Sequence, residues 1–169
     1  LVSCPMKKSE SIEMIYKTLV AVEKMIDIKV VINFHPMSSE SILSGIKQQI
    51  KNSLDCNKVI FDSQSANKWL KKASILIYNS SSTVFEAASE GVPAIYLGPE
   101  SSLDLDKMPG GSLLKCRSSH DLTLMLEEIA QNFSLKEKSV IHARKILSSV
   151  FSKPNPNILN QIFTRSGVI

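Results

Sequence analysis

Aromatic residues are scarce in this sequence, at 6% of 169 residues, whereas hydrophobic residues of all kinds make up 43%. With so few rings, the core must be built mainly from Ile, Leu, Val, Ala and Met. The length and the hydrophobic content are typical of one globular domain with a substantial core. The chain begins with Leu1 rather than Met, inside an apolar run. We interpret it as a domain excised from a longer polypeptide.

Cysteine is also rare. Cys4, Cys56 and Cys116 are odd in number and far apart. This arrangement excludes a disulfide framework and lacks the paired spacing of a metal site. We expect buried free thiols in a reducing compartment.

Long apolar runs and basic blocks are both absent. The longest apolar runs are far shorter than the roughly 20 residues of a membrane helix, and no signal peptide is evident. We therefore expect a soluble domain. No Lys- and Arg-rich block with interleaved aromatics occurs, which argues against nucleic-acid binding. The net charge of +4 fits an ordinary solvated surface best. Nucleotide diphosphates or acidic lipid headgroups are alternative partners for this charge.

Apolar runs with the spacing of strands alternate with runs that have the spacing of helices. The predicted strands are residues 1–4, 28–34, 58–61, 74–78, 93–97 and 112–116. Two helices are opened by Ser9 or Ser11 and by Ser38 or Ser39, and the others are residues 67–73, 83–90, 121–132, 135–151 and 157–164. This order predicts an α/β fold: a doubly wound, Rossmann-like, six-stranded parallel sheet with helices on both faces.

Hydroxyl side chains cluster where the fourth strand meets its helix. In an open parallel sheet, ligands bind beyond the carboxyl ends of the strands. Ser80, Ser81, Ser82 and Thr83 occupy that place. Free backbone N–H groups and the positive end of a helix dipole occur there too, which favours phosphate or pyrophosphate. One Ser or Thr would suffice for simple capping, so four in a row indicate more than capping. No Walker-type loop is present, which argues against an NTPase.

Two further side chains are candidates at the same edge. His35, followed by Pro36, ends the second strand and can hydrogen-bond a phosphate or donate a proton to a departing nucleotide. A surface or capping histidine is an equal alternative. Glu86 lies one turn into the helix after the hydroxyl cluster, where it can accept hydrogen bonds from a ribose. Its alternative role is a favourable interaction with the helix dipole.

These motifs resemble a known family. Residues 73–97 (ASILIYNSSSTVFEAASEGVPAIYL) look like the donor-site stretch of glycosyltransferases with the GT-B fold: strand, small-residue loop, Glu-bearing helix, Gly-x-Pro and strand. Together with His35-Pro36, they are most similar to bacterial sialyl- and polysialyltransferases and to CDP-glycerol glycerophosphotransferases. The resemblance implies the carboxy-terminal, nucleotide-sugar-binding half of such an enzyme.

The resemblance also implies roles for the candidate residues. Ser81 and Ser82, with Ser80 and Thr83 less directly, would hold the donor phosphates, and Glu86 would bind the ribose. Main-chain groups near Ile60 and Phe61 would contact the nucleobase. His35 would contact the phosphate and stabilise the departing nucleotide as the catalytic residue. No metal or other cofactor is expected. Asp104-Leu105-Asp106 has the spacing of a metal motif, but we interpret it as part of a loop.

The resemblance divides the chain in two and implies a missing part. Residues 1–153 would form the donor-binding domain, and residues 154–169 a helix that crosses back to a missing amino-terminal acceptor domain. Such a fragment is expected to bind donor weakly and to be inactive alone. The implied setting is surface-polysaccharide synthesis in a bacterial cytoplasm, with contact at the inner face of the plasma membrane.

Two other functions stay open. A UDP-GlcNAc 2-epimerase-like half-domain has a similar loop and helix, but favours Gly-Gly where Ser82-Thr83 stands here. A non-catalytic nucleotide-binding or interaction module is the third alternative, because fold alone does not fix function. The sequence does not identify the sugar, the base, the acceptor, the stereochemical outcome or the oligomeric state.

Overall fold

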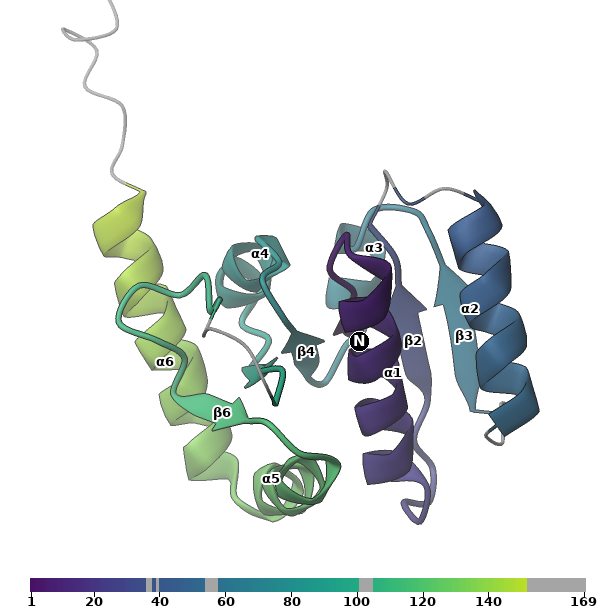
Figure 1. Cartoon of the computed structure of the whole chain (residues 1–169). Helices are drawn as coiled ribbons and strands as arrows, with labels where there is room; N and C mark the ends of the chain where they lie inside the picture. Colours follow the sequence, from purple (N-terminus) through teal and green to yellow (C-terminus); the bar gives the residue numbers. More distant parts are fainter. Residues whose placement is uncertain (36–37, 39, 54–57, 101–104, 152–169) are drawn as a thin grey trace, which may run out of the picture.

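A six-stranded parallel sheet forms the centre of the computed structural model, which describes residues 1–35, 38, 40–53, 58–100 and 105–151 (Figure 1). Strands and helices alternate along most of the chain, as predicted. The elements are β1 (Val2–Ser3), α1 (Lys8–Val22), β2 (Val30–Asn33), α2 (Glu40–Ser53), β3 (Val59–Asp62), α3 (Asn67–Leu70), β4 (Leu76–Tyr78), α4 (Thr83–Glu90), β5 (Ala94–Leu97), β6 (Leu114–Cys116), α5 (Ser119–Gln131) and α6 (Phe133–Val150).

The strand order is β3-β2-β1-β4-β5-β6. Every neighbouring pair is parallel, and Val2 of β1 lies between Ile32 of β2 and Ile77 of β4. The direction of strand order therefore reverses between β1 and β4. The strands β2 and β3 lie on one side of β1, whereas β5 and β6 lie on the far side of β4. This confirms the doubly wound, Rossmann-like fold, and it places the topological switch point between β1 and β4.

Helices cover both faces of the sheet, as expected for strands that are apolar on both sides. One buried cluster joins strand residues such as Ile32 and Ile95 to Ile15 of α1, Ile46 of α2 and Leu122 of α5. A second cluster, on the other face, joins Leu76 and Tyr78 to α3, α4 and α6. In Figure 1 the two groups of helices lie on opposite sides of the strands. The central strands β1, β2, β4 and β5 are thus buried along their length, whereas β3 and β6 at the two edges each have an exposed residue.

The prediction that Ser9 or Ser11 caps the first helix is wrong. Lys7 occupies the cap position of α1 and makes no side-chain cap hydrogen bond. The hydroxyl of Ser11 is buried and donates to the backbone oxygen of Pro5 at 2.7 Å, so it fastens the turn before the helix instead. Ser39, one predicted cap of the second helix, lies outside the described residues, and α2 begins at Glu40.

The remaining boundaries agree more closely with the sequence. Gly91 ends α4 in the left-handed conformation (φ +75°), which glycine adopts without steric cost. Ser118 caps α5, whose first turn begins two residues before the predicted start, and Asn132 caps α6. Residues 152–169, which include the predicted linker and crossing helix, lie outside the described part of the chain.

The loop between β5 and β6 is organised around Asp106. Its carboxylate accepts hydrogen bonds from the backbone N–H groups of Ser112 at 2.7 Å and Met108 at 3.0 Å. It also accepts one from the Tyr78 hydroxyl and pairs with Lys115 Nζ at 3.1 Å. Asp106 thus belongs to a loop, as predicted, but it anchors that loop to β4 and β6. Asp104 lies outside the described residues.

Candidate functional site

A cavity of about 380 Å³ opens at the carboxyl edge of the sheet, beside the switch point. It is formed where four strands end, so residues distant in the sequence meet there. Its lining comes from the ends of β1 and β2, from the loop after β3, and from the start of α4. The lining residues are Ser3, Cys4, Asn33, Phe34, His35, Ser63, Gln64, Ser65, Ala66, Ser81, Ser82, Thr83 and Glu86.

Three hydroxyl groups form a compact triangle in the lining of this cavity. The oxygens of Ser3 and Ser81 are 2.9 Å apart, those of Ser81 and Thr83 are 2.9 Å apart, and those of Ser3 and Thr83 are 3.1 Å apart. Ser81 Oγ also accepts the backbone N–H of Thr83 at 3.3 Å. The triangle therefore ties the end of β1 to the loop before α4 and fixes the beginning of that helix. The sequence analysis did not predict Ser3 as a site residue. The feature that could have indicated it is a hydroxyl side chain at the end of the first apolar run.

The amino-terminal end of α4 faces the same cavity. Ser82 occupies the cap position, but its hydroxyl makes no cap hydrogen bond, and its side chain is exposed. The cap residue therefore keeps a hydroxyl donor available to a ligand at the start of the helix, whereas the Thr83 N–H donates to Ser81 Oγ and the Phe85 N–H to the Ser82 carbonyl. Ser80 does not line the cavity. It adopts φ +48° and forms the turn that leads from β4 into the loop.

Glu86 and His35 also line the cavity. Glu86 is exposed in the first turn of α4, and His35 is half-buried just after β2. The backbone N–H of Ser38 donates to the His35 carbonyl at 2.9 Å, which turns the chain at this point. The structure thus brings together five of the eight predicted site residues: His35, Ser81, Ser82, Thr83 and Glu86.

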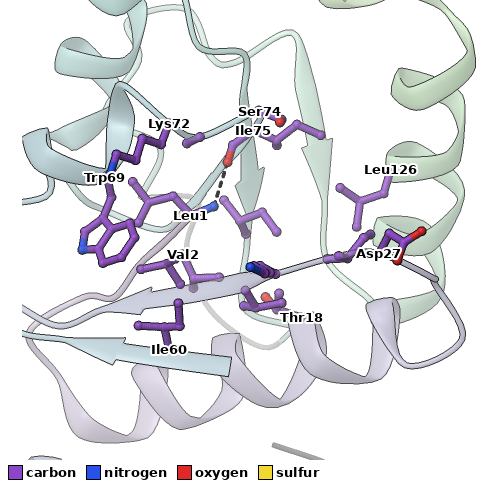
Figure 2. A pocket seen from close by; sticks show the side chains of 16 residues that line it. Leu1, Val2, Thr18, Asp27, Ile60, Trp69, Lys72, Ser74, Ile75 and Leu126 are labelled. Atoms are coloured by element: carbon purple, nitrogen blue, oxygen red, sulfur yellow. Dashed lines mark hydrogen bonds between the residues drawn. The ribbon is translucent and has the colours of Figure 1, made fainter. Parts of the chain in front are cut away.

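Main-chain groups near Ile60 and Phe61, which were predicted to contact a nucleobase, belong to β3, and neither residue is among the lining of this cavity. Ile60 lines a second cavity, at the amino-terminal edge of the sheet (Figure 2). Phe61 stacks on Phe34 with 6.2 Å between the ring centroids, so it supports the cavity wall from behind. The loop that follows, residues 63–66, supplies the lining at this point.

That loop is held by polar contacts that the sequence analysis missed. Asn33 Nδ2 donates to the carbonyl of Gln64 at 2.7 Å, and the Gln64 N–H donates to Asp62 Oδ1 at 2.9 Å. Asp62 also accepts the indole N–H of Trp69. The Gln64 and Trp69 hydrogen bonds hold the pKa of the Asp62 carboxyl below its usual range. The contact of Asn33 could have been suspected from the sequence, because Asn33 is a polar residue at the end of an otherwise apolar strand.

The chemistry of the lining favours an anion over a metal ion. Hydroxyls, backbone N–H groups and a helix amino terminus are donors to anionic oxygens. Among the described residues, no three His, Cys, Asp or Glu side chains are grouped to hold a metal ion. Cys4 is buried, and burial raises the pKa of its thiol well above the usual range, so it does not act as a nucleophile. Cys116 is likewise buried and free, as expected for these thiols. Cys56 lies outside the described residues.

The described helices include none that is long and apolar enough to cross a membrane. The expected contact with a membrane surface stays a prediction.

Comparison with known proteins gives structural matches only. No protein-family model and no curated protein matches the sequence. The spinosyn rhamnosyltransferase SpnG, solved with thymidine diphosphate, matches with a TM-score of 0.64 and 15% identity over 96% of this chain and 44% of that one. A UDP-N-acetylglucosamine 2-epimerase matches with a TM-score of 0.56 and 14% identity over 88% of this chain and 41% of that one.

An isolated domain also matches. The carboxy-terminal domain of a group 1 family glycosyl transferase (LpcC) from Francisella tularensis has a TM-score of 0.58 and 17% identity, over 92% of this chain and 85% of that domain. This chain therefore spans less than half of the two larger enzymes, but most of the single domain. Its fold is the one shared by domains of glycosyltransferases and of a UDP-sugar epimerase.

Proposed function

We propose that this chain is the donor-binding domain of a glycosyltransferase and that its cavity holds the diphosphate of a nucleotide-activated sugar. The observation that carries the proposal is the hydroxyl triangle of Ser3, Ser81 and Thr83 at the start of α4, inside a cavity at the switch point. The triangle fixes a helix amino terminus, and a fixed helix amino terminus is an anion site. SpnG, which has the same fold, was solved with thymidine diphosphate.

In this proposal each lining residue has a defined part. Ser82, whose hydroxyl is not used for capping, donates to a phosphate oxygen at the positive end of the α4 dipole. Ser81 and Thr83 hold that turn in place, and Ser80 shapes the loop. Glu86 accepts hydrogen bonds from the ribose. The base lies toward the end of β3, against residues 63–66 or the main chain near Ile60 and Phe61.

Sugar transfer breaks the bond between the anomeric carbon and the terminal phosphate oxygen. Negative charge then develops on that oxygen as the nucleotide departs. In this proposal the amino terminus of α4 stabilises this charge, and His35, which lines the same cavity, adds a hydrogen bond or a proton. These positions require no metal ion in the donor site, and we propose that none is used.

Finer assignments extend the same proposal. The His35-Pro36 and Ser-Ser-Thr motifs favour a bacterial enzyme of the sialyl, polysialyl or CDP-glycerol type. Its acceptor would be a surface glycan held by a separate amino-terminal domain, in the cytoplasm at the membrane surface. The match to an epimerase supports a second candidate, a UDP-GlcNAc 2-epimerase-like half-domain. A protein that contains this domain and converts UDP-GlcNAc without any acceptor would favour the epimerase.

Nucleotide binding is the direct test. We expect one of CMP, CDP, UDP, GDP and ADP, but not NAD, to raise the melting temperature of the chain. A ligand at a hundredfold excess over its dissociation constant adds about 2.7 kcal/mol to the free energy of unfolding. Ser81→Ala is expected to weaken binding roughly tenfold, because the loop before α4 loses three hydrogen bonds and the site loses a hydroxyl. Calorimetric titration measures the change.

The matched control is Ser89→Ala, which removes a hydroxyl from the exposed far end of the same helix. It should bind as the unaltered chain does. The absence of binding by every nucleotide, or unchanged binding by Ser81→Ala, would contradict the donor-site proposal and leave a non-catalytic module as the better description.

A further inference from the structure

The loop of residues 63–66 forms the wall of the carboxyl-edge cavity at the end of β3. Its backbone is fixed at Gln64, whose N–H donates to Asp62 Oδ1 at 2.9 Å and whose carbonyl accepts from Asn33 Nδ2 at 2.7 Å. The Gln64 N–H is thus already paired within the protein. Residues 63–65 are exposed. Hydrogen bonds from this wall to a ligand therefore come mainly from the side chains of the loop.

The side-chain amide of Gln64 has a defined orientation. Lys68 Nζ, in α3, donates to Gln64 Oε1 at 3.3 Å. The same ammonium lies 3.6 Å from Asp62 Oδ2 and 5.1 Å from the centre of the Trp69 ring. A lysine ammonium only donates hydrogen bonds, so the carbonyl end of the amide is the end that faces it. The NH2 end of Gln64 is therefore the end left for a ligand in the cavity that this residue lines.

The other polar groups of this wall add donors rather than acceptors. The Asp62 carboxylate is occupied by two N–H donors and by the Lys68 ammonium. Ser65 Oγ accepts the backbone N–H of Asn67 at 3.4 Å, which leaves its hydroxyl hydrogen to donate. The wall thus presents the NH2 group of Gln64 and the hydroxyl of Ser65, close to a positive charge. These groups suit a ligand edge that is rich in hydrogen-bond acceptors.

Nucleobases differ in the ring nitrogen at the centre of their pairing edge. In cytosine and adenine this nitrogen is an acceptor, whereas in uracil and guanine it carries a hydrogen and donates. The Ser63 hydroxyl can donate or accept and so does not discriminate between them. The Gln64 NH2 group does discriminate, because two N–H donors that face each other are both left unpaired, which lowers the affinity.

We propose that Gln64 selects the base of the bound nucleotide and that Lys68 is the positioning residue that sets its amide. The base is one whose pairing edge has an acceptor at the ring nitrogen, as in cytosine or adenine. This inference rests on the proposed donor site. It also separates the two candidate functions, because the uracil of UDP-GlcNAc has an N–H at that position and is disfavoured by the fixed amide.

Calorimetric titration of the 169-residue chain with CDP, UDP, ADP and GDP is the test. We expect CDP to bind about tenfold more tightly than UDP if the site takes pyrimidines, or ADP about tenfold more tightly than GDP if it takes purines. Gln64→Glu keeps the shape of the side chain but replaces the NH2 donor with an acceptor oxygen. It should reverse the preference, so that UDP or GDP binds more tightly than its partner.

Lys68→Met tests the positioning role. Without the ammonium, either end of the Gln64 amide can face the ligand, so the ratio of the two affinities should fall toward one while the better of them changes little. The matched control is Lys71→Met, which removes an exposed lysine from the end of α3 and should leave the ratio unchanged. An unchanged ratio in Lys68→Met would remove the positioning role of Lys68.

The same titrations distinguish failure of this inference from failure of the donor site. If the nucleotides bind but Gln64→Glu leaves their relative affinities unchanged, base selection by Gln64 is wrong and the donor site stands. A preference for UDP or GDP in the unaltered chain would also overturn the inference alone. If none of the four nucleotides binds, the donor site and the base selection are both wrong.

Discussion

Replacing Asp106 with alanine is expected to lower the free energy of unfolding by about 3 kcal/mol, the largest effect of any loop substitution considered for this chain. The Asp106 side chain is 4% exposed. It accepts hydrogen bonds from Tyr78, Met108 and Ser112. Alanine would remove the acceptor of the Met108 and Ser112 N–H groups and would leave the Tyr78 hydroxyl with Ser112 Oγ alone. Chemical denaturation, followed by circular dichroism, measures the change.

Lys107→Ala is the matched control. Lys107 is exposed in the same loop, next to Asp106, which makes the hydrogen bonds described above. It should change the free energy of unfolding by less than about 0.5 kcal/mol. Tyr78→Phe removes one donor only and should cost less than Asp106→Ala. An Asp106→Ala chain as stable as the Lys107→Ala chain would mean that the loop does not depend on this carboxylate.

The same carboxylate makes stability depend on pH. Burial by itself raises the pKa of Asp106, but hydrogen bonds from Tyr78, Ser112 and Met108 outweigh it and hold the pKa below its usual range. Because the folded pKa is lower than the unfolded one, Asp106 contributes stability above about pH 4. The contribution is lost as the pH falls through the folded pKa. The melting temperature of the Asp106→Ala chain should therefore fall less between pH 5 and pH 3 than that of the unaltered chain.

The second large effect is expected on ligand binding. Ser82→Asp should lower the affinity for the nucleoside diphosphate by about a hundredfold, because a carboxylate at the cap of α4 repels the phosphates at short range. The same change should leave the fold intact or slightly more stable, since aspartate is a favoured cap and its charge suits the helix dipole. The hydroxyl triangle does not include Ser82 and stays unaltered.

Opposite effects on stability and on binding make this test specific. Ser89→Asp adds the same charge at the exposed end of α4 far from the cavity and should change the affinity little. Calorimetric titration gives the affinity, and thermal denaturation without nucleotide gives the stability. If Ser82→Asp binds nucleotide as tightly as Ser89→Asp does, the phosphates do not lie at the amino terminus of α4.

Much of the architecture could be predicted because its signals are local. The apolar run 28–34 and its equivalents indicated strands covered on both faces, and their alternation with helices indicated the parallel order. The rule that ligands bind at carboxyl ends then placed His35, Ser81 and Glu86 at one edge. The structure brings these three side chains to the same cavity. Their roles toward a nucleotide stay predictions.

What could not be predicted depends on partners distant in the sequence. Serine is a common helix-cap residue, but the Ser11 hydroxyl donates a hydrogen bond to the Pro5 carbonyl instead. Asp106 was interpreted as a plain loop residue because Tyr78, 28 positions earlier, gives no local sign of the contact. The predicted base contact named only main-chain groups near Ile60 and Phe61 and missed the following loop, which the hydrogen bond from Asn33 to Gln64 holds at the cavity.

The reversal of strand order at β1 and β4 has a consequence for how the binding cavity can change. The chain leaves β1 toward one side of the sheet and β4 toward the other. The position of the crevice between the ends of these two strands is thus determined by the path of the backbone, and the side chains only line it. In the proposed donor site, β1 and α4 form the phosphate end, and residues 63–66 form another part of the lining. We therefore expect that exchanging this short loop would change which base the proposed site accepts without changing its anion site, so that one scaffold can serve different donors.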